Sequence, residues 1–128
     1  MRFELDFYSS EIERIEALDD ALLVRFSAAH VYRVDPETGS VGGYAGGLVM
    51  CFTAANWVGD LGACIGGVAD GSLAVDGLRA ARLPLPLNRS GVVDADFRFI
   101  NGTTLTLRAS TVQCDNPDPA LFSESYAC

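Results

Sequence analysis

An Asn-Gly pair, Asn101-Gly102, separates two stretches of this chain in which apolar and polar residues alternate, VVDADFRFI and TTLTLRASTVQ. Asn-Gly between two alternating stretches is the strongest short-range signal for a β-hairpin. Because successive side chains point to opposite faces of a strand, the position of the turn decides which side chains share a face. This pair therefore constrains the fold more than any other feature of the sequence.

The alternation distinguishes two possible registers of that hairpin. A two-residue loop would place Arg98 opposite Leu105, and it would set apolar residues against polar ones along both strands. A three-residue loop over residues 100–102, with Gly102 in the left-handed conformation, gives one apolar face and one polar face. We therefore predict the second register. Its expected pairs are Phe97 with Leu105, Ala95 with Leu107, Val93 with Ala109, Asp96 with Thr106 and Asp94 with Arg108.

Similar alternation predicts strands near the N-terminus. Residues 2–8 alternate cleanly, and residues 21–34 form the longest alternating stretch, so we expect a bend or bulge near Ala28-Ala29. Residues 9–18 fit either a short helix or the first arm of a hairpin that turns at Asp19-Asp20. A helix this short is only marginally stable by itself, whereas paired aspartates are ordinary turn residues. We therefore favour the hairpin.

Glycine and proline delimit the remaining strands. Residues 42–57 are apolar on both faces, as in a central strand, and Asp70-Gly71 and Asp76-Gly77 predict tight turns. The stretch 83–87, LPLPL, predicts an edge strand or an extended connection, because proline has no N–H to donate within a sheet. Together these features predict an all-β fold, an antiparallel sandwich or partly closed barrel of about seven to nine strands.

Length and charge limit the classes of function. The 128 residues suffice for a single all-β domain, 1–128. The net charge of −8 argues against nucleic acid and anionic membranes as partners. The longest apolar run, 41–58, contains glycines and Asn56 and does not predict a transmembrane helix. The N-terminal stretch is acidic and alternating, so we expect a cytoplasmic protein with reduced cysteines, of which Cys51 and Cys64 lie in the core.

The sequence offers little for catalysis. His30 is the only histidine, and it lies on the apolar side of the alternation, so we expect it to be buried and hydrogen-bonded. The four cysteines have no zinc-binding spacing, and the glycine-rich stretch 42–47 matches no phosphate-binding motif. We therefore predict no catalytic residue, no metal site, no cofactor and no enzymatic activity.

Aromatic and amide side chains are the candidates for binding. Trp57 is the only tryptophan, and an amphipathic ring at the end of a strand suits a ligand-binding opening or an oligomer interface. A small β-barrel that binds an apolar or sugar-like molecule is one hypothesis. Its candidate ligand-binding residues are His30, Tyr32, Tyr44, Asn56 and Trp57.

Uneven charge favours a different hypothesis, a non-enzymatic module that self-associates or binds another protein. Residues 1–20 hold seven acidic residues and two arginines, whereas residues 79–108 hold two acidic residues and five arginines. Arg79, Arg82 and Arg89 can complement the acidic N-terminal strand of the same or another subunit. Strand edges also have to be covered, and two-fold pairing is the commonest way to cover them. We therefore expect a homodimer.

Overall fold

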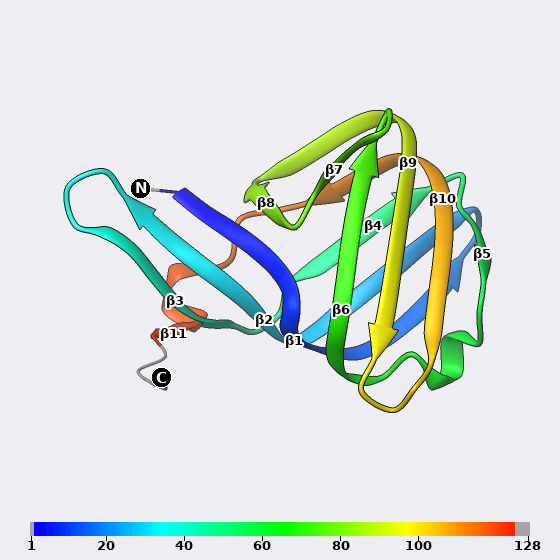
Figure 1. The fold of residues 1–128 in the computed structure, drawn as a ribbon, viewed down its shortest axis with the longest axis horizontal. Helices are drawn as coiled ribbons and strands as arrows, with labels where there is room; N and C mark the ends of the chain where they lie inside the picture. Colours follow the sequence, from blue (N-terminus) through cyan, green and yellow to red (C-terminus); the bar gives the residue numbers. More distant parts are fainter. Residues whose placement is uncertain (1, 125–128) are drawn as a thin grey trace.

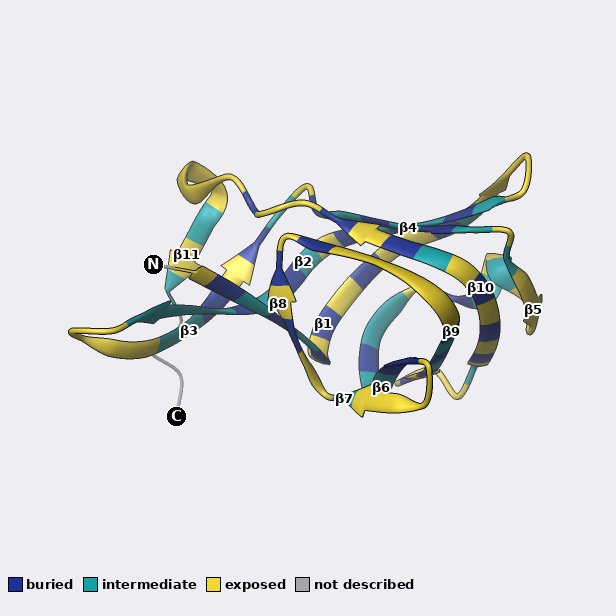
Figure 2. Cartoon of the chain, turned by 90° about the horizontal axis from the view of Figure 1, so that it is seen from above, coloured by how far each residue is buried: buried dark blue, intermediate teal, exposed yellow. Residues whose placement is uncertain are grey.

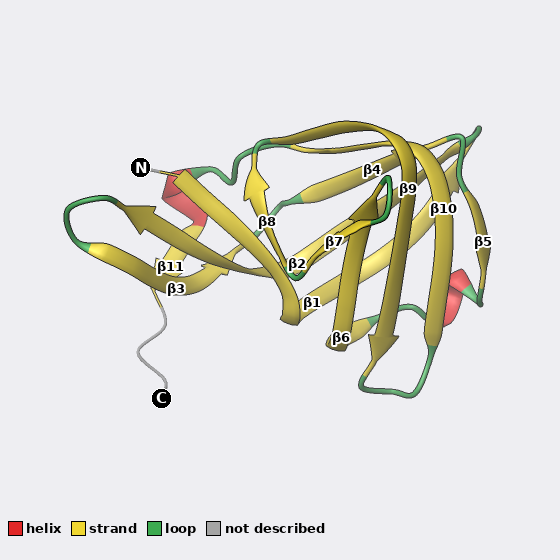
Figure 3. Ribbon diagram, turned by 45° about the horizontal axis from the view of Figure 1, so that its top comes forward, coloured by secondary structure: helices red, strands yellow, loops and turns green. Residues whose placement is uncertain are grey.

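Eleven β-strands and two short 3-10 helices account for most of the computed structural model, which describes residues 2–124 (Figures 1 and 3). No helix in this range has the length or apolar character needed to cross a membrane. The strands are β1 (Arg2–Leu18), β2 (Ala21–Asp35), β3 (Gly39–Ala45), β4 (Val49–Thr53), β5 (Asn56–Val58), β6 (Gly66–Val75), β7 (Leu78–Ala80), β8 (Arg82–Leu85), β9 (Leu87–Phe99), β10 (Thr104–Cys114) and β11 (Phe122–Glu124). The 3-10 helices are η1 (Leu61–Ala63) and η2 (Pro119–Leu121).

Six of the strands close into an antiparallel barrel, in the order β1, β2, β4, β10, β9 and β6. The ring closes because β6 pairs with β1 through Gly67 opposite Glu11 and Gly66 opposite Ile12. The other five strands are hydrogen-bonded outside this ring. The predicted all-β antiparallel fold is confirmed, and its barrel alternative is the correct one. The described residues hold more strands than the predicted seven to nine because several outer strands have only three or four residues.

The hairpin of β9 and β10 has the predicted register. Phe97 pairs with Leu105 and Asp94 pairs with Arg108. Gly102 has φ 90°, and its N–H donates to the Phe99 carbonyl oxygen at 3.0 Å, which closes the three-residue loop. Burial alternates along β10, as Figure 2 shows, and along residues 93–99 of β9. Parity therefore identified both the turn and the face that enters the core.

Other predicted turns and edges are confirmed as well. Residues 9–18 belong to β1, which turns at Asp19-Asp20 into β2, so the helix alternative is excluded. Asp76 and Gly77 have φ 51° and 84° and connect β6 to β7. The proline-containing strand β8 lies at one end of the strand order, next to β1.

The predicted turn at Asp70-Gly71 is wrong, because both residues lie inside β6. They pair there with Arg98 and Phe97 of β9. Gly71 faces the barrel interior, where a Cβ atom built on it would lie only 2.7 Å from the Cβ of Phe7. A glycine is needed here because β1 and β6 approach each other too closely for a side chain, and not because the chain turns.

Residues 42–57 do not form one strand, because the chain turns at two places within them. Gly47 and Ala54, with φ 76° and 52°, separate β3, β4 and β5. Within this region β4 is central, as predicted, since it pairs with β2 on one side and β10 on the other. Cys51 of β4 is partly exposed, so its predicted core position is wrong; the neighbouring Met50 and Phe52 face the interior instead.

A bulge divides β1 and β2 into two parts, at the position expected from the length of β2. Asp6 pairs with His30 and Glu11 pairs with Ala28, so four residues of β1 lie opposite Ala29 alone. On one side of this bulge the two strands belong to the barrel. On the other side they form, with β3, β8 and β11, a sheet that extends from the barrel and that we call the wing (Figure 1).

Apolar side chains fill the barrel and continue beneath the wing as one cluster. It includes Phe7, Phe52, Phe97 and Leu107 in the barrel and Leu5 in the wing, each at most 2% exposed. Phe7 and Phe97 contact edge to face, with ring centroids 4.9 Å apart. Ser10 is the only buried polar residue among those described. The barrel interior is therefore a packed core.

Alanine substitutions at two glycines test the loop assignment. Gly102→Ala should lower the free energy of unfolding by about 1–2 kcal/mol, because an L-residue is disfavoured in the left-handed region. No atom lies within 4 Å of a Cβ built on Gly102, so crowding contributes nothing. Gly46→Ala is the control: it meets only Ser27 O at 3.7 Å, and it should raise stability by about 0.4–1 kcal/mol. Urea denaturation measures both changes, and shifts of the same sign would contradict the assignment.

Thiol reactivity tests the packing of the core. Burial raises the pKa of the Cys114 thiol to about 12, and burial also raises the pKa of Cys64. At pH 8 both are protonated and shielded, so they should react with iodoacetamide only after unfolding, whereas the partly exposed Cys51 should react in the native protein. Mass spectrometry of the labelled peptides measures the order. Equal native labelling of Cys114 and Cys51 would contradict the packing; Cys128 lies outside the described residues.

Candidate functional site

Three of the five candidate ligand-binding residues come together on the outer face of the wing. His30 of β2 pairs with Tyr44 of β3, and Tyr32 follows on the same face of β2. The His30 ring centroid lies 4.9 Å from that of Tyr32 and 5.3 Å from that of Tyr44. Opposite Tyr32 stands Gly42, where a Cβ would lie 3.3 Å from the Tyr32 ring. The glycine leaves room for the rings to lie against the sheet.

Arg82 of β8 extends these rings into a row. Its Cζ lies 3.7 Å from the centroid of the Tyr32 ring, a cation–π contact. Its Nη2 is 3.0 Å from Oε1 of Glu4, whose other carboxylate oxygen is 3.2 Å from Arg2. The expected contact between the basic segment and the acidic N-terminal strand is therefore made here within one chain. We call the four residues Arg82, Tyr32, His30 and Tyr44 the aromatic row.

His30 is half-exposed, so its predicted burial is wrong. Next to the bulge opposite Ala29, Ser27 of β2 has no opposite residue in β1, because Ala28 pairs with Glu11 and Phe26 with Ile12. This extra residue exchanges the two faces of β2 and turns Ala29 and Val31 inward in place of His30. Nδ1 of His30 is 3.0 Å from the Tyr8 carbonyl oxygen, which can only accept, so Nδ1 carries the proton. Within residues 2–124 the other nitrogen, Nε2, has no hydrogen-bond partner. In the neutral ring Nε2 is therefore an acceptor directed at the outer face.

The other two candidate residues, Asn56 and Trp57, lie apart from the aromatic row. They belong to β5, which pairs with β10 on the side of the barrel away from the wing (Figure 1). Trp57 is 37% exposed and, with Asn56 and Arg108, lines a shallow hollow of about 300 Å³. The structure thus divides the five candidates between two surfaces.

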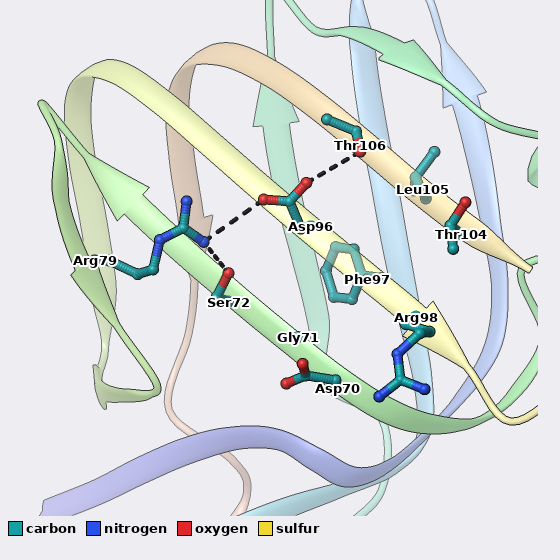
Figure 4. Close-up of a pocket in the computed structure, with 10 residues that line it drawn as sticks. All are labelled: Asp70, Gly71, Ser72, Arg79, Asp96, Phe97, Arg98, Thr104, Leu105 and Thr106. Carbon is teal, nitrogen blue, oxygen red and sulfur yellow. Dashed lines mark hydrogen bonds and ion pairs between the residues drawn. The ribbon is translucent and has the colours of Figure 1, made fainter.

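A larger groove, which the sequence did not indicate, lies on the outer wall of β6, β9 and β10 (Figure 4). Its volume is about 410 Å³. At one end Arg79 Nη1 lies 3.6 Å from Asp96 Oδ2 and donates to Ser72, while Asp96 Oδ1 accepts from Thr106 at 3.0 Å. At the other end stand Asp70 and Arg98. We call this hollow the wall groove.

Neither surface assembles a recognisable catalytic group. Within residues 2–124, no three histidine, cysteine, aspartate or glutamate side chains are grouped so as to hold a metal ion. Of the carboxylates opposite the aromatic row, Glu4 is ion-paired with Arg82 and Arg2, and Asp6, which pairs with His30, accepts a hydrogen bond from the Tyr8 N–H. The wing presents neighbouring tilted rings, and the barrel wall presents paired charges.

Comparison with known proteins adds no relative from which a role could be transferred. No family model, no curated protein and no solved structure matches this chain.

Proposed function

We propose that the protein is a non-enzymatic binding module that self-associates, as a two-fold dimer, through the aromatic row of the wing. The observation that carries this proposal is the row itself: three neighbouring rings, tilted against one another, and a guanidinium lie side by side on the outer face of a sheet, with Tyr44 37% exposed. Tyrosine and arginine are enriched at the energetically dominant positions of protein interfaces.

The packed core supports binding on the outside of the barrel. The residues that face the interior are apolar and almost fully buried, so binding through the interior would require repacking of the core. The wing, in contrast, ends in two strands, β8 and β11, each of which has a sheet neighbour on one side only among the described residues. A second copy on the wing would bury the exposed rings and shield these edges, which otherwise invite unspecific pairing.

Charge contributes to this interface less than the sequence indicated. Arg82 is already paired with Glu4 of its own chain. We therefore expect association through stacked rings and apolar contact, which salt affects little, rather than through ion pairs between subunits. The described cysteines are free thiols, which supports a protein of the reducing cytoplasm.

A second candidate function at the same surface is the binding of a sugar-like molecule. The Nε2 of His30 favours it, because this atom has no hydrogen-bond partner among residues 2–124 and the His30 ring neighbours those of Tyr32 and Tyr44. Neutral imidazole accepts a hydrogen bond from a hydroxyl group, and the tyrosine rings offer flat apolar surfaces.

Sedimentation of matched variants tests the dimer. The wild type at micromolar concentration should sediment as a dimer at both low and high salt. Tyr44→Asp should weaken association at least tenfold, because it replaces an exposed ring of the row by a carboxylate that the interface would bury. Val58→Asp is the control, since Val58 is 78% exposed on β5 and lies away from the wing; it should leave the dimer intact. Circular dichroism checks that both variants fold.

Two outcomes would contradict the proposal. One is a monomer of 13.6 kDa at every salt concentration, and the other is equal weakening by Tyr44→Asp and Val58→Asp. In the first case a thermal-shift screen of neutral sugars tests the second candidate. A sugar at 100 times its dissociation constant should stabilise the protein by about 2.7 kcal/mol, and Tyr44→Asp should abolish the shift.

A further inference from the structure

Two opposite charges at one end of the wall groove are left unpaired by the fold. Asp70 of β6 and Arg98 of β9 lie directly opposite each other, so their side chains project from the same face of the sheet. Figure 4 shows them at the same end of the groove with no interaction drawn between them. Among the described residues neither side chain has an ion-pair or hydrogen-bond partner, although seven of the nine arginines form ion pairs.

A neighbouring pair on the same wall shows that opposite charges in this cross-strand position can form an ion pair. Asp94 and Arg108, opposite each other on β9 and β10, form two hydrogen bonds of 2.8 and 3.4 Å. The hydrogen bond to Asp94 raises the pKa of Arg108 above its ordinary value. Asp70 and Arg98 have the same cross-strand relation and the same chemistry. They stand apart at the edge of the groove, where each can bind a group other than its neighbour.

The opposite end of the groove is already satisfied. Arg79, Asp96, Ser72 and Thr106 bond to one another, and their one positive and one negative charge balance. These residues form a fixed polar wall. Asp70 and Arg98 are therefore the charged groups of this groove that can bind a ligand.

The two unpaired groups select for a ligand with both charges. A guanidinium presents a planar set of N–H donors that fits a carboxylate, and the aspartate accepts hydrogen bonds from an ammonium group. A simple anion would be repelled by Asp70, and a simple cation by Arg98. The Phe97 ring points into the barrel and is 2% exposed, so the groove offers no ring for stacking.

The geometry points to the wall groove as a binding site for a small zwitterion, a free α-amino acid. Its carboxylate binds Arg98, its ammonium group binds Asp70, and its side chain lies along the groove towards Ser72 and Thr106. A volume of about 410 Å³ lies within the range of small-molecule sites, about 300–1,000 Å³. The site uses no residue of the aromatic row, so it exists with or without the proposed dimer.

Nuclear magnetic resonance titration of the ¹⁵N-labelled protein tests this site, with L-alanine, acetate and methylammonium as probes. L-Alanine should shift the amide signals of residues 70–72, 96–98 and 104–106 in a saturable manner. Acetate and methylammonium, which each carry one of the two charges, should bind at least tenfold more weakly. Serine and glutamate, tested next, report on which side chain the satisfied end of the groove accepts.

Single neutralising substitutions identify the groups responsible. Arg98→Gln and Asp70→Asn should each weaken L-alanine binding at least tenfold, because each removes one charge-assisted contact. The matched controls, Arg108→Gln and Asp94→Asn, each alter a paired charge on the same barrel wall and should leave the affinity unchanged. All four side chains lie on the outer face, and spectra of the free variants check that each is folded.

Three results would overturn the proposal. The first is the absence of saturable shifts in the groove with all three amino acids. The second is binding of acetate as tight as that of L-alanine, which would make the site a plain anion site. The third is an equal loss of affinity in Arg108→Gln and Arg98→Gln, which would mean that only the overall charge of the wall matters.

Discussion

The bulge between β1 and β2 is the constraint on which the rest of the structure depends. Four residues of β1, Phe7 to Ser10, lie opposite Ala29, which removes the regular hydrogen bonds of both strands at this point. Ser10 replaces them from inside: its buried Oγ donates to the Asp6 carbonyl oxygen at 2.7 Å and accepts from the His30 N–H at 2.8 Å. A buried polar group left without such partners costs about 1–3 kcal/mol. The serine hydroxyl therefore stabilises the bulge within the core, because it supplies partners for two backbone groups.

A second irregularity beside this bulge, where Ser27 of β2 has no opposite residue in β1, decides which side chains of β2 face outward. In the barrel half of β2 the even-numbered residues Leu22, Val24 and Phe26 face the interior, and beyond the bulge the odd-numbered Ala29 and Val31 do. The exchange brings His30 and Tyr32 to the outside, where regular alternation would have buried them. One strand thereby serves two purposes, a wall of the closed barrel and the platform of the aromatic row.

Local chemistry explains which parts of the fold were predictable. The register of β9 and β10 and the turns at residues 19–20 and 76–77 depend on neighbours in sequence, and all three were predicted correctly. Closure of the ring depends on two residue pairs between β1 and β6, which no local pattern indicates. Asp70-Gly71 failed as a turn because its conformation is imposed by β9 and by the approach of Phe7, both distant in sequence.

The same distinction explains the candidate sites. His30, Tyr32 and Tyr44 were found together because one short hairpin, β2 to β3, brings them to one face. Trp57 was grouped with them wrongly, since the turn at Ala54 carries β5 to the other side of the barrel. Arg82 was indicated only through charge, as a complement to the acidic N-terminal strand. The position of Asp70 opposite Arg98 could not be predicted from the sequence, because the register of β6 and β9 follows from the closed ring.

The placement of the two surfaces follows from how the barrel is stabilised. Because the core and the inner face of the wing form one apolar cluster, stability rests on residues that neither surface uses. The aromatic row stands on β3, β8 and the part of β2 beyond the ring, whereas the wall groove lies on β6, β9 and β10 of the barrel. Distant sites without shared partners contribute additively to stability. A closed, filled barrel thus lets substitutions on the aromatic row and in the wall groove act independently of each other, which is what the two proposed binding surfaces require.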